Sequence, residues 1–314
     1  MTQLLRYVGY IALLLSLLAC TGAIEARQQP LLGGVDDDAD PTAVLLLVHT
    51  ADGGEGKCTG TVIGDRTVLT AAHCVVPQQV GKDATFSLFL GPDVRLPEAQ
   101  SPLLMREVQR VAFDPEFDLD VLHQGHDLAV VVAKEPLGIT PVPLLRESLG
   151  MSVKEVRIIG YGIVATSDAE GTTAGRRRQV TAPVQGMLGP LLELGSQGVG
   201  PCAGDSGGSA LWTGGPGQPE LLLGLVSYVR RGCNGGSYVT VISQYLAEID
   251  GWLLAWDHGE SEPSSGCTMT SRPSAEVGPG LCSLLLTLFA WRAVRGLLPL
   301  QRTSSLLQLA SESQ

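Results

Sequence analysis

The sequence predicts an all-β fold, a barrel or sandwich of short strands closed by one C-terminal helix. Short apolar runs rich in Val, Leu and Ile are separated by turn residues along the middle of the chain. Gly (39) and Pro (19) are plentiful among the 314 residues while aromatic residues make up only 5%, which favours turn-rich β structure over a helical bundle. One stretch with helical period, 242–253, follows the last run. The strand-like runs are 44–48, 61–63, 67–69, 85–90, 128–132, 156–159, 221–226 and 238–241.

The composition excludes several classes of protein. Hydrophobic residues make up 44% of the chain and charged residues 17%, proportions that belong neither to a disordered nor to a collagen-like protein. The 21 basic and 32 acidic residues give a net charge of −11. Phosphate recognition needs clustered Lys and Arg, so we expect no nucleic-acid partner for a chain this acidic.

The first 20 residues have the pattern of a secretory signal peptide. Arg6 precedes an almost wholly apolar run, 11–18, and small residues follow it. The run is too short for a membrane span, which takes about 20 apolar residues. Residues 17–20 (Leu-Leu-Ala-Cys) also resemble the bacterial lipobox, in which Cys20 would carry the lipid; the alternative is that Cys20 is removed with an ordinary signal peptide. Residues 21–30 are expected to form a short propeptide or linker.

The C-terminal end has the composition of a linker followed by an apolar segment. Residues 257–276 are rich in Ser, Gly and Pro, and 277–295 are apolar and end in basic residues. Together with Gly-Cys at 266–267, this order resembles the C-terminal sorting signals of myxobacterial surface proteins, although the tail 296–314 is longer than such signals usually have. The alternative is an amphipathic or disordered tail. The two ends predict a protein exported by a bacterium, extracellular or anchored to the cell envelope through Cys20 or the C-terminal segment.

Four cysteines lie between the two ends of the chain, at Cys58, Cys74, Cys202 and Cys233. Export makes disulfides the natural expectation, and four cysteines allow three connectivities. The pairing that is local in sequence, Cys58–Cys74 and Cys202–Cys233, closes one loop in each half of the chain. No C-x-x-C spacing occurs among them, so we expect no metal and no cofactor.

Three short motifs carry residues suited to nucleophilic catalysis. His73 lies in Leu-Thr-Ala-Ala-His-Cys (69–74), directly before a cysteine. Asp127 lies in Gly-His-Asp-Leu-Ala-Val, at the start of an apolar run, and Ser206 lies in the glycine-rich Cys-Ala-Gly-Asp-Ser-Gly-Gly. A Ser hydroxyl is a weak nucleophile that needs a base, and an imidazole can both accept and return its proton near neutral pH.

In the order His, Asp, Ser, these motifs resemble the chymotrypsin-like serine peptidases. The resemblance covers about 31–256 and includes Leu-Leu-Gly-Gly at 31–34, Gly-Tyr-Gly at 160–162, Ser-Tyr-Val at 227–229 and the closing helix. It implies two antiparallel β-barrels, about 31–140 and 141–256, with the active site between them.

The resemblance also implies a function, that of a serine endopeptidase acting on protein or peptide substrates. His73 would be the base, Asp127 would hold its imidazole, and Ser206 would attack the substrate. The backbone N–H groups of Gly204 and Ser206 would form the oxyanion hole. The alternative is a catalytically inactive homologue that acts as a binding module.

The resemblance also implies a route of activation. In this family, cleavage frees an apolar N-terminus, and its ammonium pairs with the carboxylate directly before the nucleophilic serine. The matching residues in this sequence are Leu31 and Asp205. The sequence departs from the usual pattern because Pro30 precedes Leu31, and the nearest basic residue upstream is Arg27. We still expect a processed form that begins at Leu31.

The family match places five residues around the primary specificity pocket: Gly200, Ser227, Tyr228, Val229 and Gly236. Gly200 supplies no charge at the base, which disfavours substrate Arg and Lys because an unpaired buried cation is costly. Val229 lies on the wall of the pocket and narrows it, and Gly236 opposite Val229 is expected to leave the pocket some depth. The run 227–233 looks more like the leukocyte elastases than like trypsin, so we expect cleavage after small or medium aliphatic residues such as Ala, Val or Leu.

His126, beside Asp127, is not expected to be a second base. Adjacent residues on a strand point to opposite faces, so the two side chains should not share one site.

Two clusters of charged residues, one acidic and one basic, are not expected to take part in catalysis. The alternating acids Asp36, Asp38 and Asp40 lack the glycine and glutamate of a calcium loop and predict a solvated acidic loop. The three arginines at 176–178 follow a Ser- and Gly-rich stretch and predict an exposed, protease-sensitive loop.

Overall fold

The computed structural model describes residues 31, 34–149, 153–165, 167–168, 170–195, 198–230, 233 and 236–257. The predicted signal peptide, the propeptide, the C-terminal apolar segment and the tail lie outside the described residues, as does the linker beyond Asp257. Within the described part of the chain, no helix is long and apolar enough to cross a membrane.

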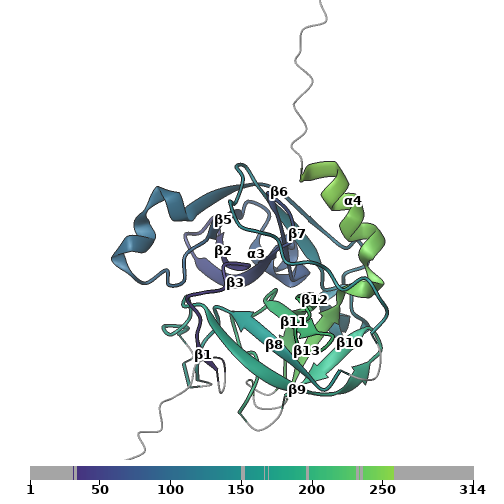
Figure 1. Cartoon of the computed structure of the whole chain (residues 1–314). Helices are drawn as coiled ribbons and strands as arrows, with labels where there is room; N and C mark the ends of the chain where they lie inside the picture. Colours follow the sequence, from purple (N-terminus) through teal and green to yellow (C-terminus); the bar gives the residue numbers. More distant parts are fainter. Residues whose placement is uncertain are drawn as a thin grey trace, which may run out of the picture. The chain divides into compact units, whose positions relative to one another are not determined.

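The first half of the described chain closes into a six-stranded antiparallel barrel (Figure 1). Its strands pair around the ring in the order β2-β3-β4-β7-β6-β5. They are β2 (Ala43–His49), β3 (Glu55–Val62), β4 (Thr67–Thr70), β5 (Thr85–Phe89), β6 (Met105–Phe113) and β7 (Ala129–Ala133). Short helices occupy the connections: η1 (Ala72–Cys74), α3 (Pro77–Val80), η2 (Pro97–Gln100), η3 (Pro102–Leu104) and η4 (Leu119–Gln124).

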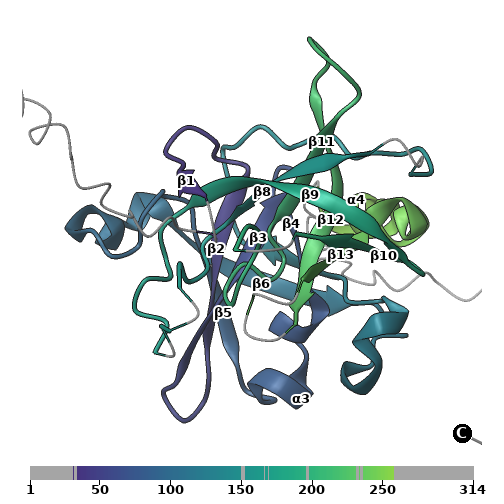
Figure 2. The ribbon, with the colours of Figure 1, turned by 90° about the horizontal axis from the view of Figure 1, so that it is seen from below.

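The second half forms another antiparallel barrel, which closes because β8 pairs with both β11 and β9. Its strands are β8 (Glu155–Gly160), β9 (Arg178–Leu188), β10 (Leu191–Leu194), β11 (Ser209–Thr213), β12 (Glu220–Val229) and β13 (Ser237–Val241). The short strand β1 (Val35–Asp36) pairs with one end of the long strand β9, and β10 pairs with the other end (Figure 2). The chain then continues through η5 (Ile242–Gln244) into α4 (Leu246–Trp256).

The predicted fold class, two antiparallel barrels with a C-terminal helix, is therefore confirmed. Each predicted strand-like run lies in or overlaps a barrel strand. The sequence analysis missed β6, β9, β10 and β11. In β6 and β9 charged and polar residues interrupt the apolar pattern, and in β10 Glu193 interrupts it within four residues.

The apolar runs are continuous because several strands are buried on both faces. In β2, Val44, Leu46 and Val48 fill the interior of the first barrel, whereas Leu45 and Leu47 pack with residues of the second barrel and of α4. A strand covered on both faces loses the alternation of apolar and polar residues. The cluster that includes Leu45 therefore joins the two barrels, and Ile249 and Trp252 of α4 complete it.

The arginines at 176–178 do not form the exposed loop that the sequence predicted. Arg177 is 2% exposed and donates hydrogen bonds to the carbonyl oxygens of Asp37 and Ala43. Arg176 lies 2.9 Å from a carboxylate oxygen of Asp36 and pairs with Asp38, so two clusters that were both interpreted as solvated neutralise each other.

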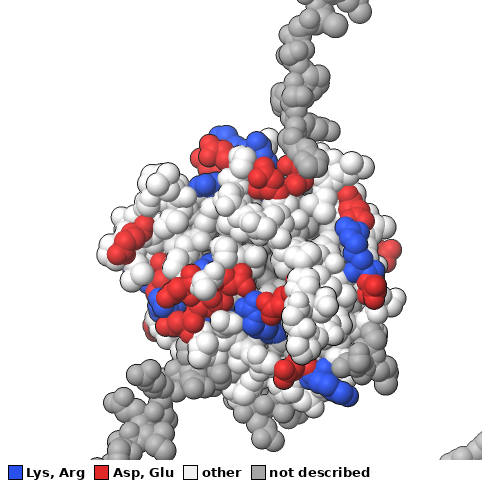
Figure 3. All heavy atoms as spheres, viewed as in Figure 1, with Lys and Arg blue, Asp and Glu red and all other residues white. Residues whose placement is uncertain are grey.

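In the space-filling view, acidic and basic side chains accordingly lie against one another rather than in separate patches (Figure 3). A second arginine, Arg157, binds Asp40 at 2.8 Å and so fastens the same N-terminal segment to β8. The ion pairs and the pairing of β1 with β9 hold residues 35–40 on the second barrel.

Candidate active site

His73 and Asp127 meet where two neighbouring strands of the first barrel end. β4 pairs with β7, with Thr70 opposite Ala129, so that η1 after β4 and the turn before β7 lie side by side. His73 Nδ1 lies 2.8 Å from Asp127 Oδ2, and the backbone N–H of His73 donates to Asp127 Oδ1 at 3.0 Å. Asp127 is completely buried, so both of its carboxylate oxygens are used to orient His73.

The second barrel also contributes to the position of Asp127. Ser227 Oγ donates to Asp127 Oδ2 at 2.5 Å, and Thr240 Oγ1 donates to the backbone carbonyl of Asp127 at 3.4 Å. Within the first barrel, Leu128 N–H donates to the carbonyl oxygen of His126 and closes a tight turn around Asp127. The sequence analysis placed Ser227 at the substrate pocket only and did not predict its bond to Asp127.

His73 and Asp127 each shift the pKa of the other in the direction that favours its charged form. Burial opposes the charged form of His73, but the adjacent Asp127 carboxylate outweighs it and raises the pKa of His73. Burial likewise opposes the ionised form of Asp127, yet the charge of His73 and the hydrogen bonds from His73 and Ser227 lower its pKa. Asp127 is therefore ionised at neutral pH and favours the His73 tautomer that carries its proton on Nδ1, which leaves Nε2 free to accept one.

Ser206 lies in a tight turn between Cys202 and β11. Asp205 N–H donates to the carbonyl of Cys202, and Gly208 N–H donates to the carbonyl of Asp205. Gly204 has φ 93°, and a Cβ there would lie 2.9 Å from the Cα of Gly162. This turn therefore requires glycine at 204 for both its backbone conformation and its packing.

The Ser206 turn docks on the first barrel directly beside His73. Thr59 N–H donates to the carbonyl of Ser206 at 2.8 Å, and Cys74 Sγ lies 4.0 Å from the same oxygen. The Ser206 hydroxyl donates to the carbonyl of Ser227 at 3.4 Å. Among the described residues no hydrogen bond joins Ser206 Oγ to His73, so the structure brings the Ser206 turn beside His73 without closing that contact.

Asp205, before Ser206, is a fully buried carboxyl held by backbone groups. Gly162 N–H donates to its Oδ1 at 2.7 Å and Cys202 N–H donates to its Oδ2 at 2.9 Å. Burial nevertheless raises the pKa of Asp205 to about 7. Leu31 is buried within the second barrel, and its nitrogen is part of the peptide bond to Pro30 in the uncut chain, so it carries no ammonium that could pair with Asp205.

The predicted pocket residues lie on β12, directly before β13 and in the loop before Cys202. β12 and β13 pair Val229 with Ser237, and the backbone N–H of Arg230 donates to the carbonyl of Gly236, so Gly236 directly precedes the residue paired with Val229. The register shifts between Val226 and Val229, and counting along the sequence cannot detect such an irregularity. Ser237 is 3% exposed, and a Cβ built on Gly200 would lie 3.5 Å from its hydroxyl.

The remaining pocket residue, Tyr228, stacks on the ring of Tyr238 with 4.6 Å between ring centroids. A Cβ on Gly236 would lie 3.6 Å from a Glu193 carboxylate oxygen.

Both disulfides of the expected pairing are formed, Cys58–Cys74 and Cys202–Cys233. The first joins β3 to η1 next to His73, and the second begins at the residue where the Ser206 turn starts. Cys58, Cys74 and His73 come close enough together to suggest a metal site, but both sulfurs are used in the disulfide and cannot act as thiolate ligands.

A family model described as Trypsin matches residues 36–253, more than half of the chain. The chain belongs to the trypsin family of serine peptidases. It is similar to human Serine protease 56, with 29% identity over 73% of this chain and 39% of the relative, and to the mouse Serine protease 56, with 27% identity over 76% of this chain and 42% of the relative. Kallikrein-1E2 of the horse is 25% identical over 48% of this chain and 59% of its own length. The chain thus spans about two fifths of the length of the first two relatives.

His126 of this trypsin-family chain binds a different acid from His73. Its Nδ1 lies 2.7 Å from Asp114 Oδ2, and its ring meets Tyr245 edge to face. The strand argument used for His126 was wrong, because β7 begins only at Ala129 and His126 has φ 64° in the turn before it. The two His–Asp pairs, His126–Asp114 and His73–Asp127, are nonetheless separate.

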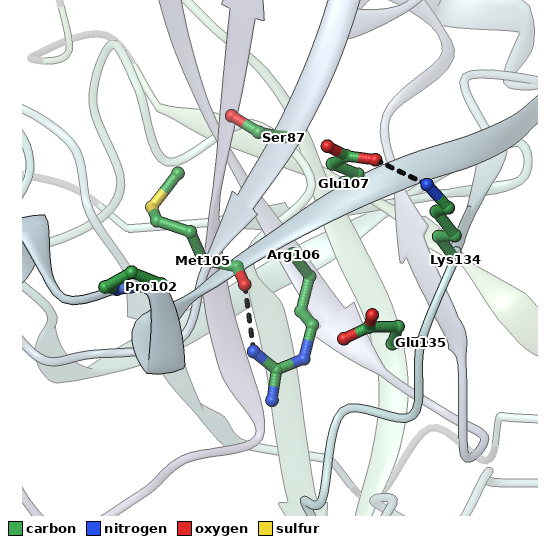
Figure 4. Close-up of a pocket in the computed structure, with 7 residues that line it drawn as sticks. All are labelled: Ser87, Pro102, Met105, Arg106, Glu107, Lys134 and Glu135. Carbon is green, nitrogen blue, oxygen red and sulfur yellow. Dashed lines mark hydrogen bonds and ion pairs between the residues drawn. The ribbon is translucent and has the colours of Figure 1, made fainter.

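A surface hollow of about 410 Å³ on the first barrel has none of the predicted site residues in its lining (Figure 4). Lys134 and Glu107 form an exposed ion pair across it at 3.0 Å, and Arg106 donates to the carbonyl of Met105. Exposed pairs of this kind contribute little, and the acidic side chains of the lining, Glu107 and Glu135, are exposed, so the lining supplies no buried base.

Proposed function

We propose that this trypsin-family chain is an exported serine endopeptidase in which Ser206, His73 and Asp127 form the catalytic triad. The observation that carries the proposal is the buried Asp127 carboxylate, which binds His73 Nδ1 at 2.8 Å and its backbone N–H at 3.0 Å. Protein or peptide substrates follow from the family.

In the proposed mechanism, His73 Nε2 takes the proton of the Ser206 hydroxyl as Ser206 Oγ attacks the scissile carbonyl carbon. The resulting imidazolium is stabilised by Asp127, which stays ionised because its pKa is lowered. The tetrahedral oxyanion accepts hydrogen bonds from Gly204 N–H and Ser206 N–H. His73 then gives its proton to the leaving amine, which leaves an acyl-enzyme on Ser206. Water attacks the acyl carbon while His73 takes its proton, and His73 returns that proton to Ser206 Oγ as the acid product leaves.

Labelling with a fluorophosphonate probe tests the proposal, because the probe reacts with an activated serine. The processed protein is expected to be labelled at Ser206, and Ser206→Ala should abolish the label while Ser101→Ala, on the surface of the first barrel, leaves it intact. Correctly folded and processed protein that takes up no label would favour the alternative, an inactive homologue that acts as a binding module.

Cleavage after small or medium aliphatic residues is the specificity that the pocket supports best. Neither Gly200 nor the Ser237 hydroxyl supplies a negative charge for a substrate Arg or Lys. The two methyl groups of Val229 oppose an aromatic ring, and the Ser237 hydroxyl lies 3.5 Å from a Cβ built on Gly200. The preference is graded, because one methylene in an apolar pocket discriminates by only ~1–3 kcal/mol.

Val229→Gly is expected to raise kcat/KM for a peptide with Phe before the scissile bond, relative to the same peptide with Val, by about tenfold or more. Removing both methyl groups widens the proposed pocket beside β12 without adding charge. The measurement is a panel of peptides that differ only in that residue. Val35→Gly, the same substitution on an exposed strand, should leave the ratio unchanged, whereas fastest turnover after Arg or Lys in the wild type would overturn the assignment.

A further inference from the structure

The two halves of the proposed triad come from different barrels. His73 and Asp127 belong to the first barrel, while Ser206 lies in a turn of the second. Attack by Ser206 on a bound substrate requires these groups to be placed within a fraction of an ångström, so the contacts that dock the Ser206 turn on the first barrel matter for the rate.

Thr59 of β3 makes two of these contacts with one residue. Its backbone N–H donates to the carbonyl of Ser206 at 2.8 Å, and its hydroxyl Oγ1 donates to the carbonyl of Gly204 at 2.9 Å. The side chain is completely buried, so no water replaces these bonds.

The hydroxyl of Thr59 is fixed by a second partner. Tyr161 N–H donates to Thr59 Oγ1 at 3.0 Å, which leaves the hydroxyl proton directed at Gly204. The next residue, Gly162, donates its N–H to Asp205 in the same turn, and Ile163 N–H donates to the carbonyl of Ala203. Thr59 and the segment 161–163 therefore hold the turn 203–206 from two sides.

Thr59 is also coupled to His73 through covalent bonds. It follows Cys58, whose disulfide partner Cys74 follows His73. A continuous set of bonds thus runs from the proposed base, through the disulfide and Thr59, to the two residues whose N–H groups would form the oxyanion hole.

We propose that Thr59 is a positioning residue, whose hydroxyl holds the Gly204 carbonyl, in the peptide that links Gly204 to Asp205, and so keeps the oxyanion-hole N–H groups of this turn and Ser206 aligned with His73. The inference rests on the proposed function of Ser206 and His73. Gly204 has φ 93° and no Cβ to restrict it, so its backbone is the part of the turn that most needs an external bond to hold it.

The test is Thr59→Val, which keeps the shape of the side chain and removes only the hydroxyl. Loss of a whole oxyanion donor costs about 100- to 1,000-fold in kcat, so a donor that is only misaligned should cost about ten- to a hundredfold. KM for a peptide substrate should stay within about twofold, because the pocket residues on β12 and β13 are untouched. A peptide aldehyde, which forms a tetrahedral adduct, should lose affinity by the same factor as kcat. Thr59→Ser, which restores the hydroxyl, should recover most of kcat.

Thr61→Val is the matched control on the same strand. Thr61 is equally buried and also reaches the second barrel, but its hydroxyl bonds to the carbonyl of Gly207 and to Ser209, outside the oxyanion turn. It should lower the melting temperature about as much as Thr59→Val does and leave kcat nearly unchanged.

The outcomes separate this inference from the proposed function. If the wild type is labelled at Ser206 and Thr59→Val keeps the kcat of Thr61→Val, the positioning role is wrong and the peptidase assignment stands. If Thr59→Ser fails to restore kcat, the hydroxyl is not the relevant group and the inference also fails. If the wild type itself neither turns over peptides nor takes the label, both proposals fail together.

Discussion

Asp127→Asn is expected to lower kcat by about four orders of magnitude while the chain stays folded. The carboxylate accepts hydrogen bonds from His73 Nδ1–H, His73 N–H and Ser227 Oγ, and the amide of Asn can accept only at its oxygen. An amide NH₂ facing Nδ1 favours the tautomer with the proton on Nε2. That nitrogen then no longer accepts the proton of Ser206.

The same substitution should move the acidic limb of the pH–kcat/KM profile to lower pH. The Asp127 charge is what raises the pKa of His73 against the opposing effect of burial, so its removal leaves burial to lower that pKa. The base form of His73 then persists to lower pH in the residual activity. Asp120→Asn, the same change at an exposed position seven residues earlier, is the control and should alter neither kcat nor the profile. Residual activity within tenfold of the wild type would contradict the role given to Asp127.

Much of the fold could be predicted from the sequence, because a strand buried on both faces, such as β2, leaves an unbroken apolar run. Strands with one exposed face carried no such signal: β9 alternates buried and exposed residues over much of its length, and the sequence analysis did not predict it. The arginines at 176–178 find partners in residues 36–43, about 140 positions away, and pattern analysis within a window cannot detect such partners.

The residues of the candidate site also divide into those that a local sequence pattern reveals and those that depend on distant parts of the chain. His73, Asp127 and Ser206 were found because each lies in a short motif whose residues are neighbours in sequence. Ser237 and Thr59 were not found, because their roles depend on pairing between strands that lie far apart in the chain. The pairing of Val229 with Ser237 follows a register shift between Val226 and Val229, and the bond from Thr59 to Gly204 spans 145 residues.

Residues 35–40 are already fixed in the uncut chain, so activation by cleavage has to reposition only the residues before them. Residues 35–40 are held on the second barrel by the pairing of β1 with β9 and by the ion pairs to Arg176 and Arg157. A cut before Leu31 would therefore change the position of only a few residues ahead of Val35. We propose that the new ammonium of Leu31 pairs with Asp205, and N-terminal sequencing of fully active protein that found Cys20 or Gln28 would refute this start site.

Asp205→Asn is expected to have opposite effects on the stability of the uncut and the cut chain. In the uncut chain burial raises the pKa of Asp205 from its ordinary value of 3.8 to about 7. Between these two values the folded chain keeps a proton that the unfolded chain has lost, so the free energy of unfolding falls as pH rises, by about 1.4 kcal/mol per pH unit. The amide that replaces the carboxyl group in the variant does not titrate in this range. From pH 5 to pH 8 the variant should therefore gain roughly 3 kcal/mol relative to the uncut wild type in urea unfolding.

In the chain that begins at Leu31, an ammonium beside Asp205 favours the carboxylate and removes this cost. The substitution should then destabilise the protein at pH 8, and kcat should fall by about 100-fold or more because the turn that carries Gly204 N–H loses its charged partner. Asp65→Asn, at an exposed position, serves as the control in both forms and should change neither the pH dependence nor kcat. A cut chain in which Asp205→Asn leaves kcat intact would show that the Ser206 turn needs no ion pair to stay in place.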